Sequence, residues 1–423
     1  MPEVGSLNTV YSADELRDRI LSLRARADVR NRWLKERLDV LLPKLMKEEG
    51  FDMWIVVARE YNEDPVMMSM LPDPQLSARR KTILLFTSRE DGSVERLILT
   101  RFGIGDFYKS AWDPDKEEQY SCLARLVKER NPKSIGINTS KIWSFGDGLT
   151  HAEYLQMIDA LGAEYVNHLR SAERLCVRWL ETRIQPEITS YPGVVEITHA
   201  IIAEAFSSRV IHPGVTTTDD VAWWMRQKMH DLGLQAWFPP TIDRQNGEGI
   251  KGNVIVPGDL IHCDVGFYYL GLATDVQRNL YIRKPGEEEA PQGILAALRD
   301  GNRLQDIHAE EMRPGRTGNE ILKSIIDRAK AEGITPSVYT HPIGVHGHAA
   351  GPIIGLWDRQ QGVPGTGEYE LQNDTCYAIE LNVKKPAAEW GSAEVKMLLE
   401  EDALFTNGSL RWLSGRQKKL YLI

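Results

Sequence analysis

The sequence predicts an α+β protein made of two domains, a smaller α/β domain at residues 1–185 and a larger mixed domain at residues 186–423. Three observations lead to this prediction. Helical and strand-like segments alternate in the first part of the chain, as they do in an α/β layer domain. The polar segment 182–187 contains a proline and marks a domain boundary. Beyond it, the chain begins with helices and becomes strand-rich after residue 339.

Length and composition limit the class of protein. The 423 residues correspond to two or three domains at about 100–200 residues each. A hydrophobic share of 42% and a charged share of 26% are typical of globular proteins and exclude collagen-like, coiled-coil and disordered chains. The net charge of -9 and the lack of a long Lys/Arg-rich block argue against a nucleic-acid partner. No apolar run approaches the roughly 20 residues of a membrane-spanning helix, so we expect no membrane partner.

The N-terminal residues and the cysteines predict a cytoplasmic location. Residues 1–5 lack the basic and apolar regions of a signal peptide, although a cleaved signal peptide would leave no trace. The cysteines are widely spaced and form no CxxC motif, which favours buried thiols in a reducing compartment. They are Cys122, Cys176, Cys263 and Cys376.

In the first domain, hydrophobic residues at helical spacing predict one long helix or two abutting helices over residues 12–50. Pro43 is expected to kink the last turns, and Gly50 is expected to end the helix. Runs of strand-forming residues predict strands at 53–58, 82–87, 96–100 and 134–138, with a helix near 117–129.

In the second domain, the helical pattern predicts helices at residues 187–206, 218–232, 293–311 and 318–333. Residues 216–220 are a natural N-cap region for the second of these helices. Early in that helix, one of Trp223 and Trp224 should face the core and the other should be partly exposed. Residues 259–282 are expected to form two strands joined by a glycine-containing turn. The GxGxxG match at 247–252 has no strand before it and no helix after it, so we interpret it as a loop.

Two aspartates in the second domain stand in otherwise apolar, strand-like segments. Asp264 lies in the run 260–266, and Asp275 lies in the run 272–277. If both runs are strands, a hairpin brings the two carboxylates to the same end. Burying two adjacent anions is costly unless a cation neutralises them. Each aspartate is therefore either bound to a metal or tightly hydrogen-bonded.

Three histidines and two glutamates follow in similar contexts. His341, His346 and His348 lie within one short segment. In an extended chain, His346 and His348 would share one face and His341 would lie on the other, so the spacing does not predict that all three converge. Glu380 and Glu400 each lie in or at the end of an apolar run. Two Asp, one His and two Glu in such contexts indicate a metal site more strongly than any single acid does.

The order Asp264, Asp275, His341, Glu380, Glu400 resembles the ligand order of the pita-bread metallohydrolases of peptidase family M24, which include methionine aminopeptidase, Xaa-Pro aminopeptidase, prolidase and creatinase. The resemblance covers roughly residues 187–415 and includes the segments around the five residues. These segments are Gly258-Asp259-Leu260-Ile261-His262-Cys263-Asp264-Val265-Gly266, Thr274-Asp275, His341-Pro342-Ile343-Gly344, Ile379-Glu380 and Leu399-Glu400-Glu401-Asp402-Ala403-Leu404-Phe405-Thr406. The resemblance implies a pita-bread C-terminal domain preceded by a creatinase-type N-terminal domain.

The resemblance also implies two divalent metal ions. This oxygen-rich donor set suits Mn²⁺ best, and Zn²⁺, Co²⁺ or Fe²⁺ would also fit. Asp264 would bind one ion, and Asp275 and Glu400 would bridge both. His341 and Glu380 would complete the other ion, and a hydroxide held between the ions would be the nucleophile.

Catalytic roles follow from the same resemblance. Glu380 would carry a proton to the leaving amine, and His348 would contact the substrate and the developing oxyanion. His346 has no counterpart, so a structural histidine is the default interpretation. The alignment makes Glu400, and not Glu401, the ligand. The substrates would be small peptides, cleaved as an Xaa-Pro aminopeptidase or dipeptidase cleaves them, and the active unit would be a homodimer.

Several positions depart from the family pattern. Gly247 stands where Xaa-Pro peptidases usually carry a histidine, and Ser337 stands where proline-specific enzymes often carry another. Leu381 replaces a frequent proline, and Leu398 replaces the usual arginine. The ligand set is complete while the residues around it differ, so the resemblance does not imply proline specificity. Two alternatives stay open. One is a hydrolase of a non-peptide C–N or amide bond on the same fold, and the other is a non-catalytic pita-bread binding protein.

Overall fold

The computed structural model describes residues 13–247, 252–391 and 393–423, which form two compact units. One unit is Ser22–Ile184, and the other joins residues 13–21 to Gln185–Ile423. Residues 13–21 belong to the second unit because the backbone N–H of Leu21 donates to the hydroxyl of Tyr269 at 2.9 Å and Arg19 pairs with Glu196 at 3.0 Å. The division into domains 1–185 and 186–423 stays a prediction. It differs from the two compact units in residues 13–21, which group with the C-terminal unit.

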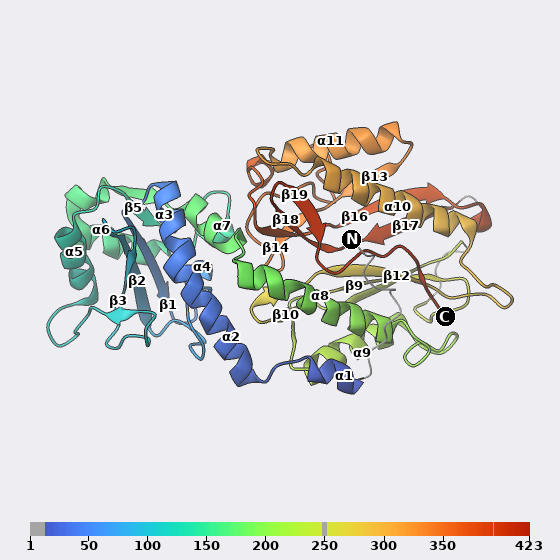
Figure 1. Ribbon diagram of the computed structural model, residues 1–423, viewed down its shortest axis with the longest axis horizontal. Helices are drawn as coiled ribbons and strands as arrows, with labels where there is room; N and C mark the ends of the chain where they lie inside the picture. Colours follow the sequence, from blue (N-terminus) through green and yellow to red (C-terminus); the bar gives the residue numbers. More distant parts are fainter. Residues whose placement is uncertain (1–12, 248–251, 392) are drawn as a thin grey trace. The chain divides into compact units, whose positions relative to one another are not determined.

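The unit Ser22–Ile184 is built on a six-stranded sheet with the order β4-β3-β2-β1-β5-β6. Its strands are β1 (Met53–Arg59), β2 (Lys81–Ser88), β3 (Val94–Ile98), β4 (Lys109–Ser110), β5 (Ile135–Ile137) and β6 (Leu169–Ser171). Its helices are α2 (Leu23–Glu36), the π-helical segment η1 (Arg37–Leu41), α3 (Leu42–Glu49), α4 (Pro65–Met68), α5 (Gln119–Arg130), the 3₁₀ turn η2 (Ser144–Gly146), α6 (His151–Val166) and α7 (Glu173–Glu181). Helices α5 and α6 pack on one face of the sheet, and α3 and α7 lie on the other (Figure 1).

The predicted strands of this unit are confirmed, and the predicted N-terminal helix is broken once, between α1 and the continuous run α2–η1–α3. Residue 12 lies outside the described residues, and α1 (Ala13–Asp18) ends before Ser22 caps α2. Pro43 closely follows the π-helical segment η1 within one continuous helical run, and the expected kink in the last turns stays a prediction. Gly50 ends α3 with a left-handed φ of 71°, as predicted.

The second unit carries four further helices and fourteen strands among its described residues. The helices are α8 (Gln185–Ala205), α9 (Thr218–Asp231), α10 (Gln292–Glu311) and α11 (Gly318–Ala331), with the 3₁₀ turns η3 (Thr366–Glu368) and η4 (Ala388–Trp390). The strands are β7 (Gln235–Ala236), β8 (Thr241–Gln245), β9 (Leu260–Val265), β10 (Phe267–Tyr269), β11 (Leu272–Ala273), β12 (Val276–Tyr281), β13 (Thr335–Val338), β14 (His341–Ile343), β15 (Thr375–Ala378), β16 (Leu381–Pro386), β17 (Glu394–Leu399), β18 (Asp402–Thr406), β19 (Ser409–Trp412) and β20 (Tyr421–Leu422).

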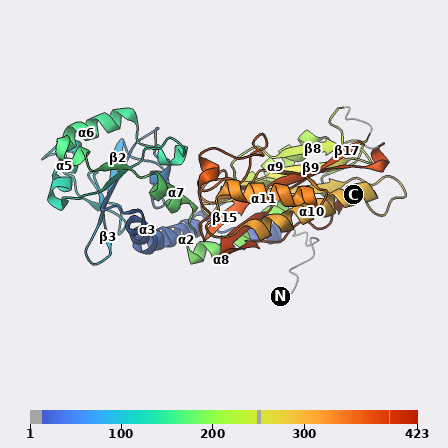
Figure 2. The same ribbon diagram turned by 90° about the horizontal axis from the view of Figure 1, so that it is seen from above.

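These strands form four sheets, with the orders β11-β10-β7, β20-β12-β9-β8, β13-β16-β17 and β14-β15-β18-β19. Helix α10 packs against β16 and β17, and α11 packs against β13, so that these two helices cover one large hydrophobic core. Helix α8 contacts β12, and α9 contacts β7 and β8. Figure 2 shows the same elements from above. The mixed α+β class is therefore confirmed, and so are the four predicted helices.

The segment 259–282 differs from its prediction of two strands. Strands β9 and β12 do pair antiparallel, but the short strands β10 and β11 lie between them. The tight turn between β10 and β11 uses Leu270 and Gly271, whose φ angles of 56° and 77° are left-handed. The loop predicted at 247–252 falls mainly on residues 248–251, which lie outside the described residues.

Helix α9 begins as predicted, at a capping box between Thr217 and Asp220. Of the two tryptophans of this helix, Trp223 is exposed and Trp224 is half-buried, so neither belongs to the fully buried face. The buried face of the helix is formed by Val221, Met225 and Met229 at fourfold spacing, and Trp223 is 64% exposed on another face. Within the part of the chain that the structure describes, no helix is long and apolar enough to cross a lipid bilayer.

Candidate metal centre

The pairing of β9 with β12 brings Asp264 and Asp275 to the same end of the hairpin. In the register of the two strands, Val265 faces Val276 and Asp264 faces Gln277. Asp275 directly precedes Val276, the first residue of β12, and so lies at the same end of the hairpin as Asp264. The backbone N–H of Asp275 donates to Oδ2 of Asp402 at 3.1 Å. The expected convergence of the two aspartates is therefore confirmed.

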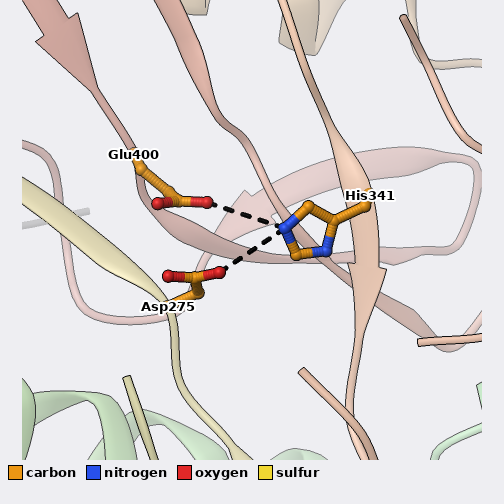
Figure 3. Close-up of side chains that lie close together, drawn as sticks. All are labelled: Asp275, His341 and Glu400. Atoms are coloured by element: carbon orange, nitrogen blue, oxygen red, sulfur yellow. Dashed lines mark ion pairs between the residues drawn. The ribbon is translucent and has the colours of Figure 1, made fainter. Parts of the chain in front are cut away.

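His341 and Glu400 reach the same place from two other sheets (Figure 3). Nε2 of His341 lies 3.5 Å from Oδ2 of Asp275 and 3.8 Å from Oε1 of Glu400. Each of these three buried residues offers one ligand atom, and the atoms lie within 4.8 Å of one another. The Nδ1 atom of His341 lies 2.9 Å from the carbonyl oxygen of Pro342, which can only accept a hydrogen bond. Nδ1 therefore carries the proton, and Nε2 presents a lone pair to two carboxylates.

Four ligand atoms at this place are buried and have no hydrogen-bond partner among the described residues. They are Oδ1 of Asp264, Oδ1 of Asp275, Nε2 of His341 and Oε1 of Glu400. Buried polar atoms are nearly always hydrogen-bonded, so each such atom needs an explanation. When the carboxylates are ionised, all four atoms are acceptors, and none of them can donate a hydrogen bond to another. A cation satisfies all of them, and the residues therefore fit a divalent metal ion.

The electrostatics of the metal-free protein show how unfavourable the arrangement is without a cation. Burial raises the pKa of Asp264 to about 6 and that of Glu380 to about 7. Burial, followed by repulsion from the neighbouring carboxylates, holds the pKa of Asp275 and of Glu400 well above their usual range. Burial lowers the pKa of His341 to about 3, so this imidazole is neutral. A bound divalent ion would reverse the effect on the carboxylates.

Glu380 joins this group through a shared amide. The side-chain nitrogen of Gln277 donates to Oε1 of Glu380 at 3.0 Å and to Oε2 of Glu400 at 2.9 Å. Glu401, next to Glu400, instead makes a buried ion pair with Arg278 at 2.7 Å. The structure thus places Glu400 in the cluster and Glu401 outside it. The assignment of the five predicted residues as metal ligands stays a prediction that this geometry supports.

His348 lies beside His341, with their ring centroids 4.7 Å apart. The spacing alone did not predict this convergence, because strict alternation along an extended chain puts the two rings on opposite faces, whereas the family resemblance placed His348 at the substrate. The chain turns after β14, where the N–H of Gly344 donates to the carbonyl of His346 at 3.0 Å and that of Ala349 to the carbonyl of Pro342 at 3.0 Å. The imidazole of His348 is exposed, whereas His346 is half-buried and still has no assigned role.

Three residues near the centre were missed by the sequence analysis, namely Gln277, Tyr339 and Asp402. Each lies two positions from a predicted ligand, so in an extended segment each shares a face with that ligand. This spacing is the signal that could have identified them. The hydroxyl of Tyr339 lies 3.5 Å from Nε2 of His348. Burial, and then the four site carboxylates, raise the pKa of Tyr339 to about 12.

Comparisons with known proteins identify the family and the fold. The profile of Metallopeptidase family M24 matches residues 193–406. A Mycoplasma pneumoniae protein provisionally named an Xaa-Pro aminopeptidase is 23% identical over 208 residues, which are 48% of this chain and 56% of that protein. The chain thus matches little more than half the length of this curated relative.

Solved structures resemble the chain over nearly its whole length. An X-Pro aminopeptidase from Thermotoga maritima matches with a TM-score of 0.64 at 14% identity, covering 90% of this chain and 100% of that one. An Xaa-Pro dipeptidase from Bacillus anthracis matches with a TM-score of 0.59 at 16% identity, covering 97% and 100%. At these identities the likeness shows the fold, and the pita-bread architecture expected from the sequence is confirmed.

Proposed function

The chain belongs to metallopeptidase family M24, and we propose that it is a hydrolase of short peptides that acts as an Xaa-Pro aminopeptidase or dipeptidase with two divalent ions. The observation that carries the proposal is the set of buried, unpartnered acceptor atoms on Asp264, Asp275, His341 and Glu400. With Glu380 they would hold the ions, and Mn²⁺ is the ion that this oxygen-rich set suits best. When bound, the ions would lower the pKa of a water molecule and polarise the scissile carbonyl.

The residues of the chain itself would bind, orient and move protons. His341 is locked in one tautomer by the carbonyl of Pro342, so its Nε2 lone pair needs no rearrangement to bind an ion. Glu380, whose carboxylate accepts from the amide of Gln277, would take up a proton and return it to the leaving amine. His348 is exposed next to His341 and would contact the substrate carbonyl, with the hydroxyl of Tyr339 beside it.

The proposed activity includes a preference for proline after the scissile bond. Ser337 replaces a histidine that is frequent in proline-specific relatives, and it lies on β13 opposite Asn382. This substitution favours a second candidate, a hydrolase that cleaves another amide bond with the same centre. We also retain from the sequence the proposals of a homodimer, of a cytoplasmic location and of domains 1–185 and 186–423. A non-catalytic binding protein is the least favoured alternative, because nothing about binding alone requires this complete acceptor set.

A substrate panel tests the proposal. The Mn²⁺-loaded full chain is given Xaa-Pro dipeptides, Xaa-Pro-containing tripeptides and matched peptides without proline, with and without a chelator, and amine release is measured. Cleavage before proline that the chelator abolishes is the expected result. Chelator-sensitive cleavage of the non-proline peptides alone would favour the second candidate. Bound Mn²⁺ without hydrolysis of any peptide would contradict the peptidase proposal.

A further inference from the structure

The carboxamide of Gln277 is the polar group that joins the two glutamates of the candidate metal centre. Gln277 is 2% exposed on β12, and its side-chain nitrogen lies 3.0 Å from Oε1 of Glu380 and 2.9 Å from Oε2 of Glu400. Its backbone N–H also donates to the carbonyl oxygen of Glu400 at 3.3 Å. Side chain and backbone together therefore fix Glu400 against β12.

The orientation of this amide is supported by a third partner. Nε2 of His262 lies 2.8 Å from Oε1 of Gln277, and Nδ1 of His262 lies 3.4 Å from Oδ2 of Asp243. With the ring N–H donating to the amide oxygen, both amide hydrogens face carboxylate acceptors, and every polar atom of the amide is used. The opposite orientation would turn the amide oxygen toward two carboxylates. The two carboxylates therefore select this orientation of the amide, and His262 supports it by donating from Nε2 to the amide oxygen.

The hydrogen bond from Gln277 gives the two carboxylate oxygens of Glu400 different roles. Oε2 accepts from the amide, while Oε1 has no hydrogen-bond partner and points toward His341. A glutamate side chain has three rotatable bonds, so an unbound carboxylate in this place could adopt several rotamers. The amide removes this freedom before any ion arrives, and groups that orient ligands in this way typically contribute 10–100-fold in metal affinity.

We propose that Gln277, supported by His262, is a positioning residue that fixes Glu380 and Glu400 so that their remaining oxygens face the metal ions. This inference rests on the proposed function, because it takes both glutamates as ligands. Gln277 itself contributes no charge and touches neither His341 nor Asp264 through any hydrogen bond of the structure. Its effect is therefore on the geometry and affinity of the centre, and not on the identity of the ligands.

Calorimetric titration of the metal-free full chain with Mn²⁺ tests the inference. Gln277→Met keeps the length of the side chain and removes the amide, and we expect it to weaken Mn²⁺ binding about 10–100-fold. His262→Phe removes only the group that supports the amide, so its effect is expected to be smaller. In the double variant the effect of His262→Phe is expected to vanish, because His262 acts through Gln277. Equal or tighter binding by Gln277→Met would overturn the inference.

Controls separate positioning from damage to the fold. Gln245 also uses both ends of its amide, bonding the backbone of Lys396 at 2.8 and 3.0 Å, so Gln245→Leu removes a comparable group and is expected to leave Mn²⁺ affinity unchanged. The visible absorption of the Co²⁺-loaded protein reflects ligand geometry and is expected to change only in the Gln277 and His262 variants. If the wild-type chain binds no Mn²⁺, the proposed function fails. If it binds and Gln277→Met binds equally well, only the positioning role fails.

Discussion

Nε2 of His341 lies 3.8 Å from Oε1 of Glu400, and neither buried atom has a hydrogen-bond partner among the described residues. The separation is too long for a hydrogen bond. It is shorter than the ~4.2 Å that two metal–ligand bonds of ~2.1 Å span when they point in opposite directions. One ion can therefore contact both atoms. His341 is positioned by β14, and Glu400 is positioned between β17 and β18 by its backbone bridge to Gln277.

Glu400 and Glu401 are neighbours with opposite expected effects on stability. Glu400→Gln is expected to raise the unfolding temperature of the metal-free protein, because it removes one of several mutually repelling buried carboxylates. The same change is expected to weaken Mn²⁺ binding at least tenfold. Glu401→Gln leaves the buried Arg278 without its ion-pair partner and is expected to cost roughly 3 kcal/mol. Thermal unfolding and calorimetric titration of both variants check this, and a destabilised metal-free Glu400→Gln protein would contradict it.

The metal-free protein is expected to lose stability as the pH rises through the pKa values of its buried acids. The pKa values of Asp264 and Glu380 are raised to about 6 and about 7, from 3.8 and 4.5. Their contribution is therefore fully present below about pH 4 and is lost as the pH passes 6 and then 7. The unfolding temperature of the wild type, measured relative to that of Glu380→Gln, should fall across this range. A difference that stays constant with pH would contradict the raised pKa of Glu380.

His348 is expected to matter for turnover and not for metal content. Because its imidazole is exposed beside His341, the change His348→Ala should leave the Mn²⁺ stoichiometry unaltered. On the best substrate of the panel, kcat/KM is expected to fall about 100-fold. His346→Ala, in the same turn, provides the matched control and should leave kcat/KM unchanged. A His348→Ala protein that retains full activity would remove this residue from the proposed machinery.

Gly347 allows Trp237 to pack against the turn that carries His348. A Cβ atom at Gly347 would lie 2.3–2.5 Å from ring atoms of Trp237, and the Trp237 and His348 ring centroids are 5.1 Å apart. Gly347→Ala is therefore expected to cost about 1–3 kcal/mol of stability and to lower activity by moving His348. Gly193→Ala in helix α8 meets nothing within 4 Å and is expected to gain about 0.5–1 kcal/mol. Chemical denaturation of both variants measures the contrast.

Much of the site could be predicted because charged side chains within apolar, strand-like segments are energetically unfavourable unless they have a partner. Asp264 and Asp275 interrupt apolar strands, and an antiparallel hairpin brings such residues to one end whatever lies between them. The hairpin β10–β11 was not foreseen, since a turn through a left-handed leucine has no clear sequence signal. Alternation alone would put His348 on the face opposite His341, but alternation holds only while the chain stays extended, and the turn at Gly344–Gly347 ends it.

Neutral residues were harder to predict than charged ones. Gln277 carries no charge, and nothing in the sequence shows that Glu380 and Glu400 will lie on either side of its amide. Likewise, the sequence did not decide which of Trp223 and Trp224 is exposed, and the phase of helix α9 places Trp223 outward, where the guanidinium of Arg226 lies 4.3 Å from its ring centroid. In both cases tertiary packing, and not local pattern, decides the role.

We expect the unpartnered acceptors of Asp264, Asp275, His341 and Glu400 to bind divalent ions. Anomalous diffraction at the manganese absorption edge, from crystals of the full chain grown with Mn²⁺, tests it most directly. We predict anomalous peaks at about 2.0–2.3 Å from Nε2 of His341 and Oε1 of Glu400, and their absence in Glu400→Gln crystals. Well-ordered crystals in saturating Mn²⁺ with no anomalous peak at these atoms would contradict this expectation.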